Sequence, residues 1–318
     1  MARLVVLLGG HSMEREVSLL TGGRVRYALE RLGHEVLSLD LEETTTETLM
    51  EWQPDAAFIC LHGVGGEDGT VQALLETLGI PYTGSGPLSS LRSIDKDYAK
   101  RMMLSGNVPT PPFHTFFRRA MQEMGAASAL GVAGESLGFP LMVKPARGGS
   151  GLGVSQADSR EGLLDAVYEA FGYDAKIILE RHVPGTEITV PIIEPSGEPP
   201  RALGLVEVRP RDGTYDYGAR YTPGMTDFAI PAEIPEKTAA RVETVALDAY
   251  RTLGCSGFAR VDIILEEETP WVIEANTIPG FTETSTLPLA AEAAGISFES
   301  LVESILETTL ESGAPAKL

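Results

Sequence analysis

Two short segments near the carboxyl-terminal end of the sequence contain the polar residues that best indicate chemistry. Arg260 and Asp262 lie in the first segment, and Glu274 and Asn276 end the second. Because side chains alternate faces along a strand, Arg260 shares one face with Asp262, and Glu274 shares one face with Asn276. The residues between them are apolar and β-favouring, and residues 266–270 have the composition of a hairpin turn.

Antiparallel pairing of these segments would bring two carboxylates and one amide oxygen together, with the guanidinium of Arg260 beside them. Oxygen donors without sulfur or imidazole suit Mg²⁺, which takes few protein ligands and bridges substrate phosphates. The alternative is an ordinary hairpin whose polar face is only solvated. The hairpin alone does not decide between the two interpretations.

A glycine-rich loop follows a strand that we predict at residues 139–144. Lys144 ends this strand, and four of the six residues at 148–153 are glycine. Glycines let backbone N–H groups approach phosphate oxygens, and the lysine supplies a positive charge. It is not a Walker A loop, because the lysine precedes the glycines. A glycine-rich surface turn is the alternative.

Other polar residues lie where predicted strands end. Glu14 follows a buried strand at residues 4–8 and a pair of glycines. An acid at a helix start usually complements the helix dipole, and the alternative is a carboxylate that binds a substrate ammonium. His62 opens a glycine-rich loop after a strand at residues 56–61, where it is either a site residue or a hydrogen-bonded structural histidine.

Two further segments have both a functional and a structural interpretation. Glu180 ends a strand predicted at residues 177–180, and Val183 and Glu187 follow it. Carboxylates spaced in this way hold adenine and ribose, or they are simply solvated. Three tyrosines within residues 215–221 indicate either a lid that closes on a ligand or an edge-strand packing patch.

The order of the predicted elements indicates an α/β protein with three domains. Residues 1–90 alternate strand, helix and strand, which predicts a doubly wound parallel sheet with a ligand site at the carboxyl ends of its strands. Residues 91–183 form a second unit that contains the glycine-rich loop. The third unit, residues 184–318, contains the hairpin and two helices predicted at 237–253 and 298–311.

Composition narrows the class of protein further. The chain has 318 residues and a net charge of −20, from 45 acidic and 25 basic residues, which argues against nucleic acid or an anionic membrane as a partner. Cys60 and Cys255 lie in apolar contexts and predict buried free thiols. The apolar run at the start is too short for a signal peptide, and no segment approaches the ~20 apolar residues that span a bilayer. We therefore expect a cytoplasmic protein.

Together these motifs resemble the D-alanine–D-alanine ligases of the ATP-grasp superfamily. The resemblance runs from Gly9 to about Leu306. It rests on motifs in the family's order: EREVS, HGVGGEDG, PYTGSG, the Asp95–Lys96 pair, the Lys144 loop, YDYGARY, and RVD followed by EANTIPGFTETS. It implies an ATP-grasp fold of three domains with ATP held between the central and carboxyl-terminal domains.

The resemblance also implies a role for each matching residue. ATP would be bound by Lys96, Lys144, Glu180, Val183, Glu187 and Arg220. Two Mg²⁺ ions, for which Mn²⁺ is an alternative, would be bound by Asp262, Glu274 and Asn276. The substrates would be held by Glu14, His62 and Ser285. Ser150 and Tyr221 would close the lid in a hydrogen-bonded triad with Glu14, and Arg260 and the amide of Gly280 would stabilise an oxyanion.

The activity implied is the ATP-dependent joining of two D-alanine molecules through D-alanyl phosphate, for peptidoglycan synthesis. The nearest alternative is a related ligase whose second substrate is D-serine or D-lactate. A nucleotide-binding module without turnover disagrees with the complete metal and Arg260 set. A dehydrogenase disagrees with the first glycine turn, which lacks the GxGxxG spacing. The oligomeric state is left open, a homodimer included.

Two departures from the family pattern concern ATP affinity and lid closure. The family commonly has lysine where this chain has Arg220, which keeps the charge and changes its shape. It also has a Ser–Ser–Val run where this chain has Ser150, Gly151 and Leu152, which removes one hydroxyl and loosens the loop. Neither departure removes a metal ligand.

Overall fold

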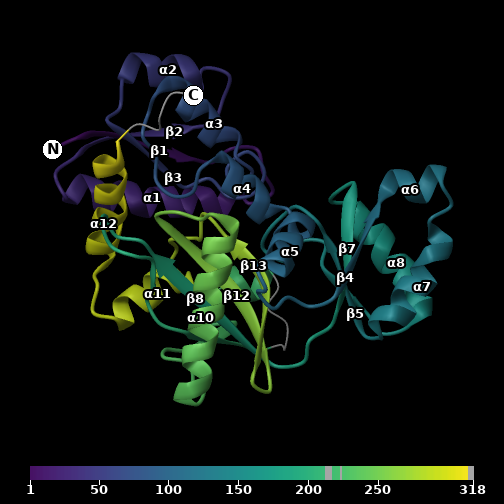
Figure 1. Ribbon diagram of the computed structural model, residues 1–318. Helices are drawn as coiled ribbons and strands as arrows, with labels where there is room; N and C mark the ends of the chain where they lie inside the picture. Colours follow the sequence, from purple (N-terminus) through teal and green to yellow (C-terminus); the bar gives the residue numbers. More distant parts are fainter. Residues whose placement is uncertain (212–216, 223, 314–318) are drawn as a thin grey trace.

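The computed structural model of the chain describes residues 1–211, 217–222 and 224–313, and its strands form three sheets (Figure 1). The first sheet is parallel, with the order β2-β1-β3. Its elements alternate along the chain as β1 (Arg3–Leu8), α1 (Arg15–Arg31), β2 (Glu35–Asp40), α2 (Thr45–Trp52), β3 (Ala56–Ile59) and α3 (Thr70–Leu78). The predicted strand–helix–strand unit is therefore present, and both glycine turns lie at the carboxyl ends of its strands.

The second sheet is antiparallel, with the order β4-β7-β5-β6, and it carries the predicted glycine-rich loop between two of its strands. Its helices α6, α7 and α8 pack in a core separate from the rest of the molecule, and form the right-hand part of Figure 1. The elements are β4 (Phe113–Phe117), α6 (Arg118–Glu123), α7 (Ala127–Leu137), β5 (Leu141–Pro145), β6 (Ser155–Ala157), α8 (Arg160–Phe171) and β7 (Lys176–Arg181).

The third sheet has the order β11-β10-β8-β12-β13, with β9 paired to β8. Its strands are β8 (Thr186–Ile193), β9 (Arg201–Ala202), β10 (Val206–Pro210), β11 (Thr226–Ala229), β12 (Phe258–Glu266) and β13 (Thr269–Asn276). The remaining helices are α4 (Pro87–Ile94), α5 (Lys96–Ser105), α9 (Tyr217–Tyr221), α10 (Glu236–Leu253), α11 (Thr286–Ala293) and α12 (Phe298–Ser312). In the part of the chain that the structure describes, no helix combines the length and hydrophobicity needed to span a membrane.

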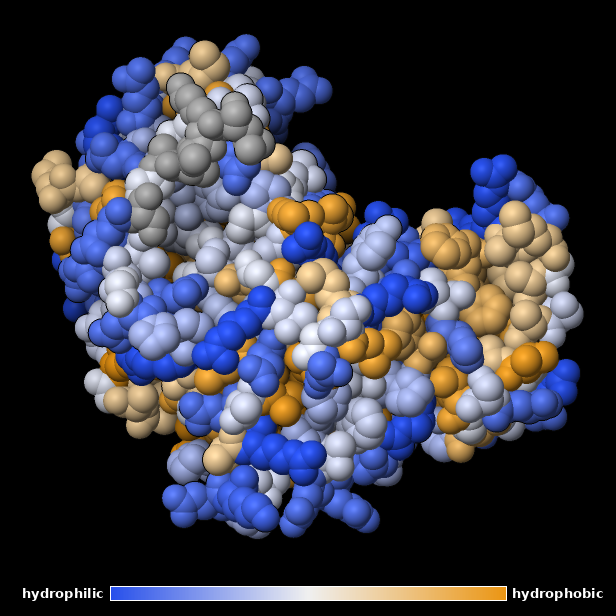
Figure 2. Space-filling view, viewed as in Figure 1, coloured by the Kyte–Doolittle hydropathy of each residue, from blue (hydrophilic) through white to orange (hydrophobic). Residues whose placement is uncertain are grey.

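The first and third sheets share one hydrophobic core, whereas the second sheet stands apart. Phe281 lies at the centre of the shared core, where its ring meets Phe58 and Phe258 edge-on at centroid distances of 5.8 and 5.7 Å. The surface is hollowed between the first sheet's helices and the lobe of α6, α7 and α8 (Figure 2). This arrangement leaves the second sheet facing a body made of the other two.

Helix α5 joins the second sheet to this larger body. Asp95 caps the helix by accepting hydrogen bonds from the backbone N–H groups of Asp97 and Tyr98. The apolar face of α5, with Ala99 and Met103, packs in the core of the third sheet. The start of α5 therefore brings Lys96 to the junction between the sheets.

Candidate active site

The predicted hairpin forms between β12 and β13 with the predicted residues opposite one another. Asp262 is paired with Glu274, and Arg260 is paired with Asn276. The turn is tighter than predicted, because Glu267 adopts a positive φ of 54° and β13 begins at Thr269. A register irregularity directly after Asp262 separates this polar end of the hairpin from its apolar remainder.

Asp262 is held by three neighbouring side chains. The Nε and Nη2 atoms of Arg260 donate to its two oxygens, each at 2.8 Å. Thr189 on β8 donates to Oδ1 at 2.8 Å, and Asn276 donates to Oδ2 at 3.2 Å. Strands on both sides of β12 thus fix the orientation of this buried carboxylate.

Glu274 lies in a strongly positive environment. Burial alone would raise its pKa, but the charges of Lys96, Arg220, Arg260 and Lys144 outweigh burial and lower the pKa to about 2. The ammonium of Lys96 is 3.2 Å from Glu274 Oε2, and it also donates to the backbone oxygen of Gly148 at 2.8 Å. Lys96 therefore connects the hairpin to the first residue of the glycine-rich loop. Despite the acidity of the whole chain, this region concentrates cations.

The hairpin offers only a few oxygen donors to a hard cation. Among the described residues, no three His, Cys, Asp or Glu side chains are grouped so that they could hold a metal. Asp262 and Glu274 supply two carboxylates, and Asn276 adds an amide oxygen. Such a small set suits Mg²⁺, whose coordination in nucleotide sites is completed by water and phosphate oxygens.

A second group of charged side chains lies in the sheet that carries the glycine-rich loop. Lys144, at the end of β5, forms a buried ion pair with Glu180 on the adjacent strand β7. Val183 is buried just beyond the end of β7, and Glu187 lies on β8 opposite Ile264 of β12. Burial raises the pKa of Glu187 to about 7. These residues lie around the junction of the second and third sheets.

The glycine-rich loop reaches the start of α1 at Glu14. Ser150 adopts a positive φ of 55° and its hydroxyl donates to Glu14 Oε1. A Cβ atom on Gly149 would lie 3.0 Å from both carboxylate oxygens, and one on Gly63 would lie 2.8 Å from Oε2. The close approach therefore favours glycine at both positions, and the positive φ of 70° at Gly63 favours it further. Burial raises the pKa of Glu14, whose hydrogen bond with Ser150 acts in the opposite direction.

His62 is buried and links α1 to the loop that contains Gly280. Its Nε2 is hydrogen-bonded to Thr21 Oγ1 at 3.2 Å, and the backbone N–H of Phe281 donates to the same hydroxyl at 3.4 Å. Burial lowers the pKa of His62 to about 4. Ser285 is turned toward the same loop, because its hydroxyl accepts a hydrogen bond from the backbone N–H of Thr282 at 3.0 Å.

Helix α9 lies beside this region. Thr284 donates to the backbone oxygen of Arg220 at 3.1 Å, and the charge of Arg220 acts on the pKa values of Glu14, Glu187 and Glu274. The side chain of Tyr221 and residues 212–216 of the predicted tyrosine lid lie outside the described residues.

Two titratable residues near the site were not predicted from the sequence. Glu67 accepts a hydrogen bond from the Gly63 N–H at 2.7 Å, and it lines a small cavity together with Lys96 and Glu274. Burial, followed by the charge of Glu14, raises the pKa of Glu67 to about 8. Its position within the HGVGGEDG motif was the available signal. Lys100, directly behind Glu180, had no comparable signal, because a lysine in a helix is usually solvated.

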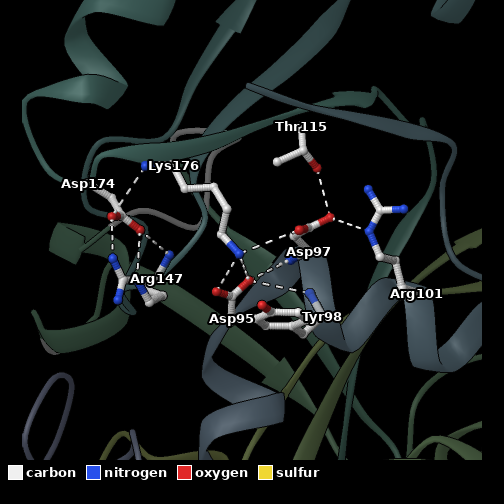
Figure 3. Close-up of polar contacts among 8 residues, drawn as sticks. All are labelled: Asp95, Asp97, Tyr98, Arg101, Thr115, Arg147, Asp174 and Lys176. Atoms are coloured by element: carbon white, nitrogen blue, oxygen red, sulfur yellow. Dashed lines mark hydrogen bonds and ion pairs between the residues drawn. The ribbon is translucent and has the colours of Figure 1, made fainter. Parts of the chain in front are cut away.

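A polar network supports the two segments that carry Lys96 and the glycine-rich loop (Figure 3). Lys176 on β7 forms an ion pair with Asp95, the residue that caps α5. Asp174 accepts hydrogen bonds from both the backbone N–H and the guanidinium of Arg147, at 3.0 and 2.9 Å. Arg147 immediately precedes the glycine-rich loop, so this network fixes the start of α5 and the base of the loop together.

A larger cavity, of 680 Å³, lies away from these residues. It is lined in part by Glu194, Glu198 and Ser256, and neither the hairpin acids nor Glu14 contribute to it. A cavity of 210 Å³ does include Glu14, together with Arg147 and Gly149. We place the candidate site at Glu14 and the hairpin, since the convergent charges and the glycine-rich loop lie there.

Comparison with known proteins gives a consistent result along the chain. The family model described as "D-ala D-ala ligase C-terminus" matches residues 102–307, and that described as "D-ala D-ala ligase N-terminus" matches residues 38–85. The chain is 42% identical to a D-alanine–D-alanine ligase from Desulforudis audaxviator, covering 97% of this chain and 99% of the relative. It is also 42% identical to the enzyme of that name from Pelotomaculum thermopropionicum, covering 96% of each.

Solved structures agree with these relatives. The D-alanine–D-alanine ligase from Bacillus anthracis complexed with ATP has a TM-score of 0.81 and 33% identity, covering 98% of each chain. The VanG D-Ala:D-Ser ligase from Enterococcus faecalis has a TM-score of 0.81 and 27% identity, covering 96% of this chain and 99% of that chain. The matched sequence, the ATP-grasp arrangement of the sheets and the near-complete coverage of these relatives together show that the chain belongs to the D-alanine–D-alanine ligase family.

Proposed function

We propose that this enzyme joins two molecules of D-alanine, with ATP as co-substrate, and releases D-alanyl-D-alanine, ADP and phosphate. The observation that carries the proposal is the hairpin pair of Asp262 and Glu274, held by Arg260 and Lys96 at the carboxyl end of β13. It combines acidic oxygen donors with the cations that a phosphoryl transfer requires. The product dipeptide is a precursor for peptidoglycan.

ATP would lie between the second and third sheets. This placement is supported by the positions of Lys144 and Glu180 on the second sheet and of Glu187 on the third. It corresponds to a division into residues 1–90, 91–183 and 184–318, with the nucleotide between the last two. The full set of ATP contacts that we propose is Lys96, Lys144, Glu180, Val183, Glu187 and Arg220.

Two Mg²⁺ ions, or Mn²⁺ in their place, would be held by Asp262, Glu274 and Asn276. When bound, the ions neutralise phosphate charge and orient the γ-phosphoryl group. The carboxylates now paired with Arg260 and Lys96 would then be shared with the metal.

Substrate binding and oxyanion stabilisation would be carried out by charged and polar groups of the protein. Glu14 is placed to accept the ammonium of the first D-alanine, whose carboxylate attacks the γ-phosphorus of ATP and gives an acyl phosphate and ADP. Arg260 and the backbone N–H of Gly280 would stabilise the oxyanion that forms when the second amine attacks this acyl phosphate. Phosphate then leaves, and His62 and Ser285 would hold the substrates in place.

Closure over the site would exclude water, which otherwise hydrolyses the acyl phosphate. The support for closure is the contact of Ser150 with Glu14, which already joins the glycine-rich loop to the start of α1. Tyr221 would complete this contact as a third member. Because the reaction consumes ATP, we infer a cytoplasmic location. A homodimer is compatible with this function, and gel filtration would test it.

The experiment that tests the proposal is coupled ADP release with D-alanine, L-alanine, D-serine and D-lactate offered in turn, alone and in pairs with D-alanine. We expect release with D-alanine alone, and chromatography should identify the dipeptide as the product. No ADP release with any amino acid would refute the ligase proposal. If ADP release requires D-serine or D-lactate together with D-alanine, the enzyme is still a ligase, and only the identity of its second substrate differs from the proposal.

A further inference from the structure

Glu180 is a single carboxylate buried between two lysines. Lys144 reaches it from β5 and Lys100 reaches it from α5, and each forms an ion pair with a different oxygen of the carboxylate. The Glu180 and Lys100 side chains are 1% and 0% exposed. Two ammonium groups and one carboxylate leave this buried cluster with one excess positive charge.

The two lysines differ in what else they can reach. The Lys100 ammonium donates to Thr110 Oγ1 at 2.6 Å, and Thr110 in turn donates to the backbone oxygen of Val272 on β13 at 2.8 Å. The ring of Phe113 covers it at 5.6 Å. Lys100 is therefore fixed within the protein, between the second and third sheets.

Lys144, by contrast, lies one residue before the end of β5, close to the glycine-rich loop. It is 9% exposed at the side chain and lies three residues before Arg147, which leads into the loop. Among the described residues, its ammonium donates a hydrogen bond to Glu180 alone. A turn of this side chain can carry its charge away from Glu180.

We propose that Lys100 is a positioning residue that neutralises Glu180, so that Lys144 can leave the carboxylate and bind the phosphates of ATP. This inference rests on the proposed function, because Lys144 is an ATP contact only there. Glu180 stays anionic and oriented by Lys100, and it keeps one oxygen free to accept a hydrogen bond from the nucleotide base. The one positive charge that Glu180 does not balance, on Lys144, can then bind the phosphates of the nucleotide.

The argument follows from the cost of an unpaired buried charge. Without Lys100, moving Lys144 away would leave Glu180 buried with no counter-charge, which is strongly unfavourable. Lys144 would then remain paired and contribute little to ATP binding. Burial lowers the pKa of Lys100 to about 8, and at pH 7 the side chain still carries most of its charge.

The test measures the affinity of each variant for MgATP by calorimetry and its kinetic constants by ADP release. For Lys100→Met we expect the Kd and KM for ATP to rise at least about tenfold, the equivalent of 1.4 kcal/mol. The kcat at saturating ATP should stay within about threefold, and the KM for D-alanine should not change. Lys100→Arg keeps the charge and should preserve ATP affinity.

The decisive variant is the double substitution Lys100→Met with Glu180→Gln. It removes both buried charges, releases Lys144, and leaves an amide oxygen in place of the carboxylate. We expect it to bind ATP more tightly than Lys100→Met alone. If Lys100 acts only through packing, adding Glu180→Gln should leave affinity unchanged or reduce it further, and that result would overturn the inference.

Matched controls separate the possible failures. Thr110→Val removes a hydrogen bond of Lys100 but no charge, and it should change the Kd for ATP by less than about twofold, well under 1 kcal/mol. If Lys144→Met binds ATP like the unmodified protein, the nucleotide assignment of the proposed function fails. If Lys144→Met is weakened and Lys100→Met is not, only the role of Lys100 fails. Should Lys100→Met not fold, weak ATP binding by both Lys100→Arg and the double variant would overturn the inference.

Discussion

Arg260→Lys is the substitution that most directly tests the chemistry of the site. The guanidinium places two N–H groups on the two oxygens of Asp262, each at 2.8 Å, and lies opposite Asn276 in the hairpin. A lysine keeps the charge but cannot hold a carboxylate with one pair of donors and point others at a second group. The variant should therefore fold normally and lose the donor aimed at the oxyanion.

The expected size of the effect follows from known oxyanion sites. Losing one preorganised donor costs ~2.7–4 kcal/mol, which corresponds to a fall of roughly 10²–10³ in kcat. The KM for ATP should change far less, because the role proposed for Arg260 is at the acyl carbon that is attacked and not at the nucleotide. The assay is coupled ADP release at saturating D-alanine, with ATP varied.

An arginine at the end of β7, paired with an acid of the same hairpin, provides the control. Arg181 places two N–H groups on Glu266 at 2.9 Å, at the turn end of β12, and both partners are partly exposed. Exposed pairs of this kind contribute little, so Arg181→Lys should leave kcat within about twofold. If Arg260→Lys lowers kcat less than about fivefold, roughly 1 kcal/mol, Arg260 is structural and our assignment is wrong.

Three further predictions concern the metal, the product and acid stability. Glu274→Gln should nearly abolish ADP release while circular dichroism stays unchanged, because an anionic ligand is lost; a near-normal rate at low Mg²⁺ would contradict the metal assignment. With equal D-alanine and D-lactate the unmodified enzyme should give mainly dipeptide, increasingly from pH 6 to pH 9 as the amine deprotonates. Tyr221→Phe should relax this choice, and predominant ester from the unmodified enzyme at pH 6 and pH 8 would refute it. His62 has a pKa lowered from 6.5 to about 4, so between these values the unfolded chain binds a proton that the folded chain does not. The free energy of unfolding should therefore fall by about 3 kcal/mol as pH drops through this window and level off below it. Urea titrations of His62→Asn should lack this component, and an equal acid loss in both proteins would contradict the prediction.

Local sequence patterns were enough to predict the helices and strands whose apolar residues follow a clear period. The apolar run of β1, the helical period of α1 and the alternation of β12 and β13 each agree with the structure. Strand β8 was not predicted, although it is an inner strand of the third sheet. Its Pro191, paired with Arg260 of β12, is unusual in an inner strand, and it interrupts the pattern that indicates one.

Helices without a clear apolar period were also missed. Helix α7 contains Gly131 and Gly134, which weaken helix propensity, and α4 contains three serines among its eight residues. Both helices are stabilised by what they pack against. Gly134 shows this directly, since a Cβ atom there would lie 2.9 Å from the ring of Phe139. Tertiary contacts stabilise these segments as helices, and a short stretch of sequence does not reveal those contacts.

The same distinction applies to the candidate site. Pairing of Asp262 with Glu274 was predictable, because a short hairpin turn leaves few registers and alternation fixes the faces. The contact of Lys96 with Glu274 depends on how α5 is held against the second and third sheets, and no sequence spacing encodes it. Lys100 is the clearest case. In the sequence it is one more lysine of a polar helix, and only the packing of β7 against α5 makes it the buried partner of Glu180. Motifs therefore indicate the residues that we propose to contact the substrates, whereas the charges that surround those residues come from elements brought together by folding.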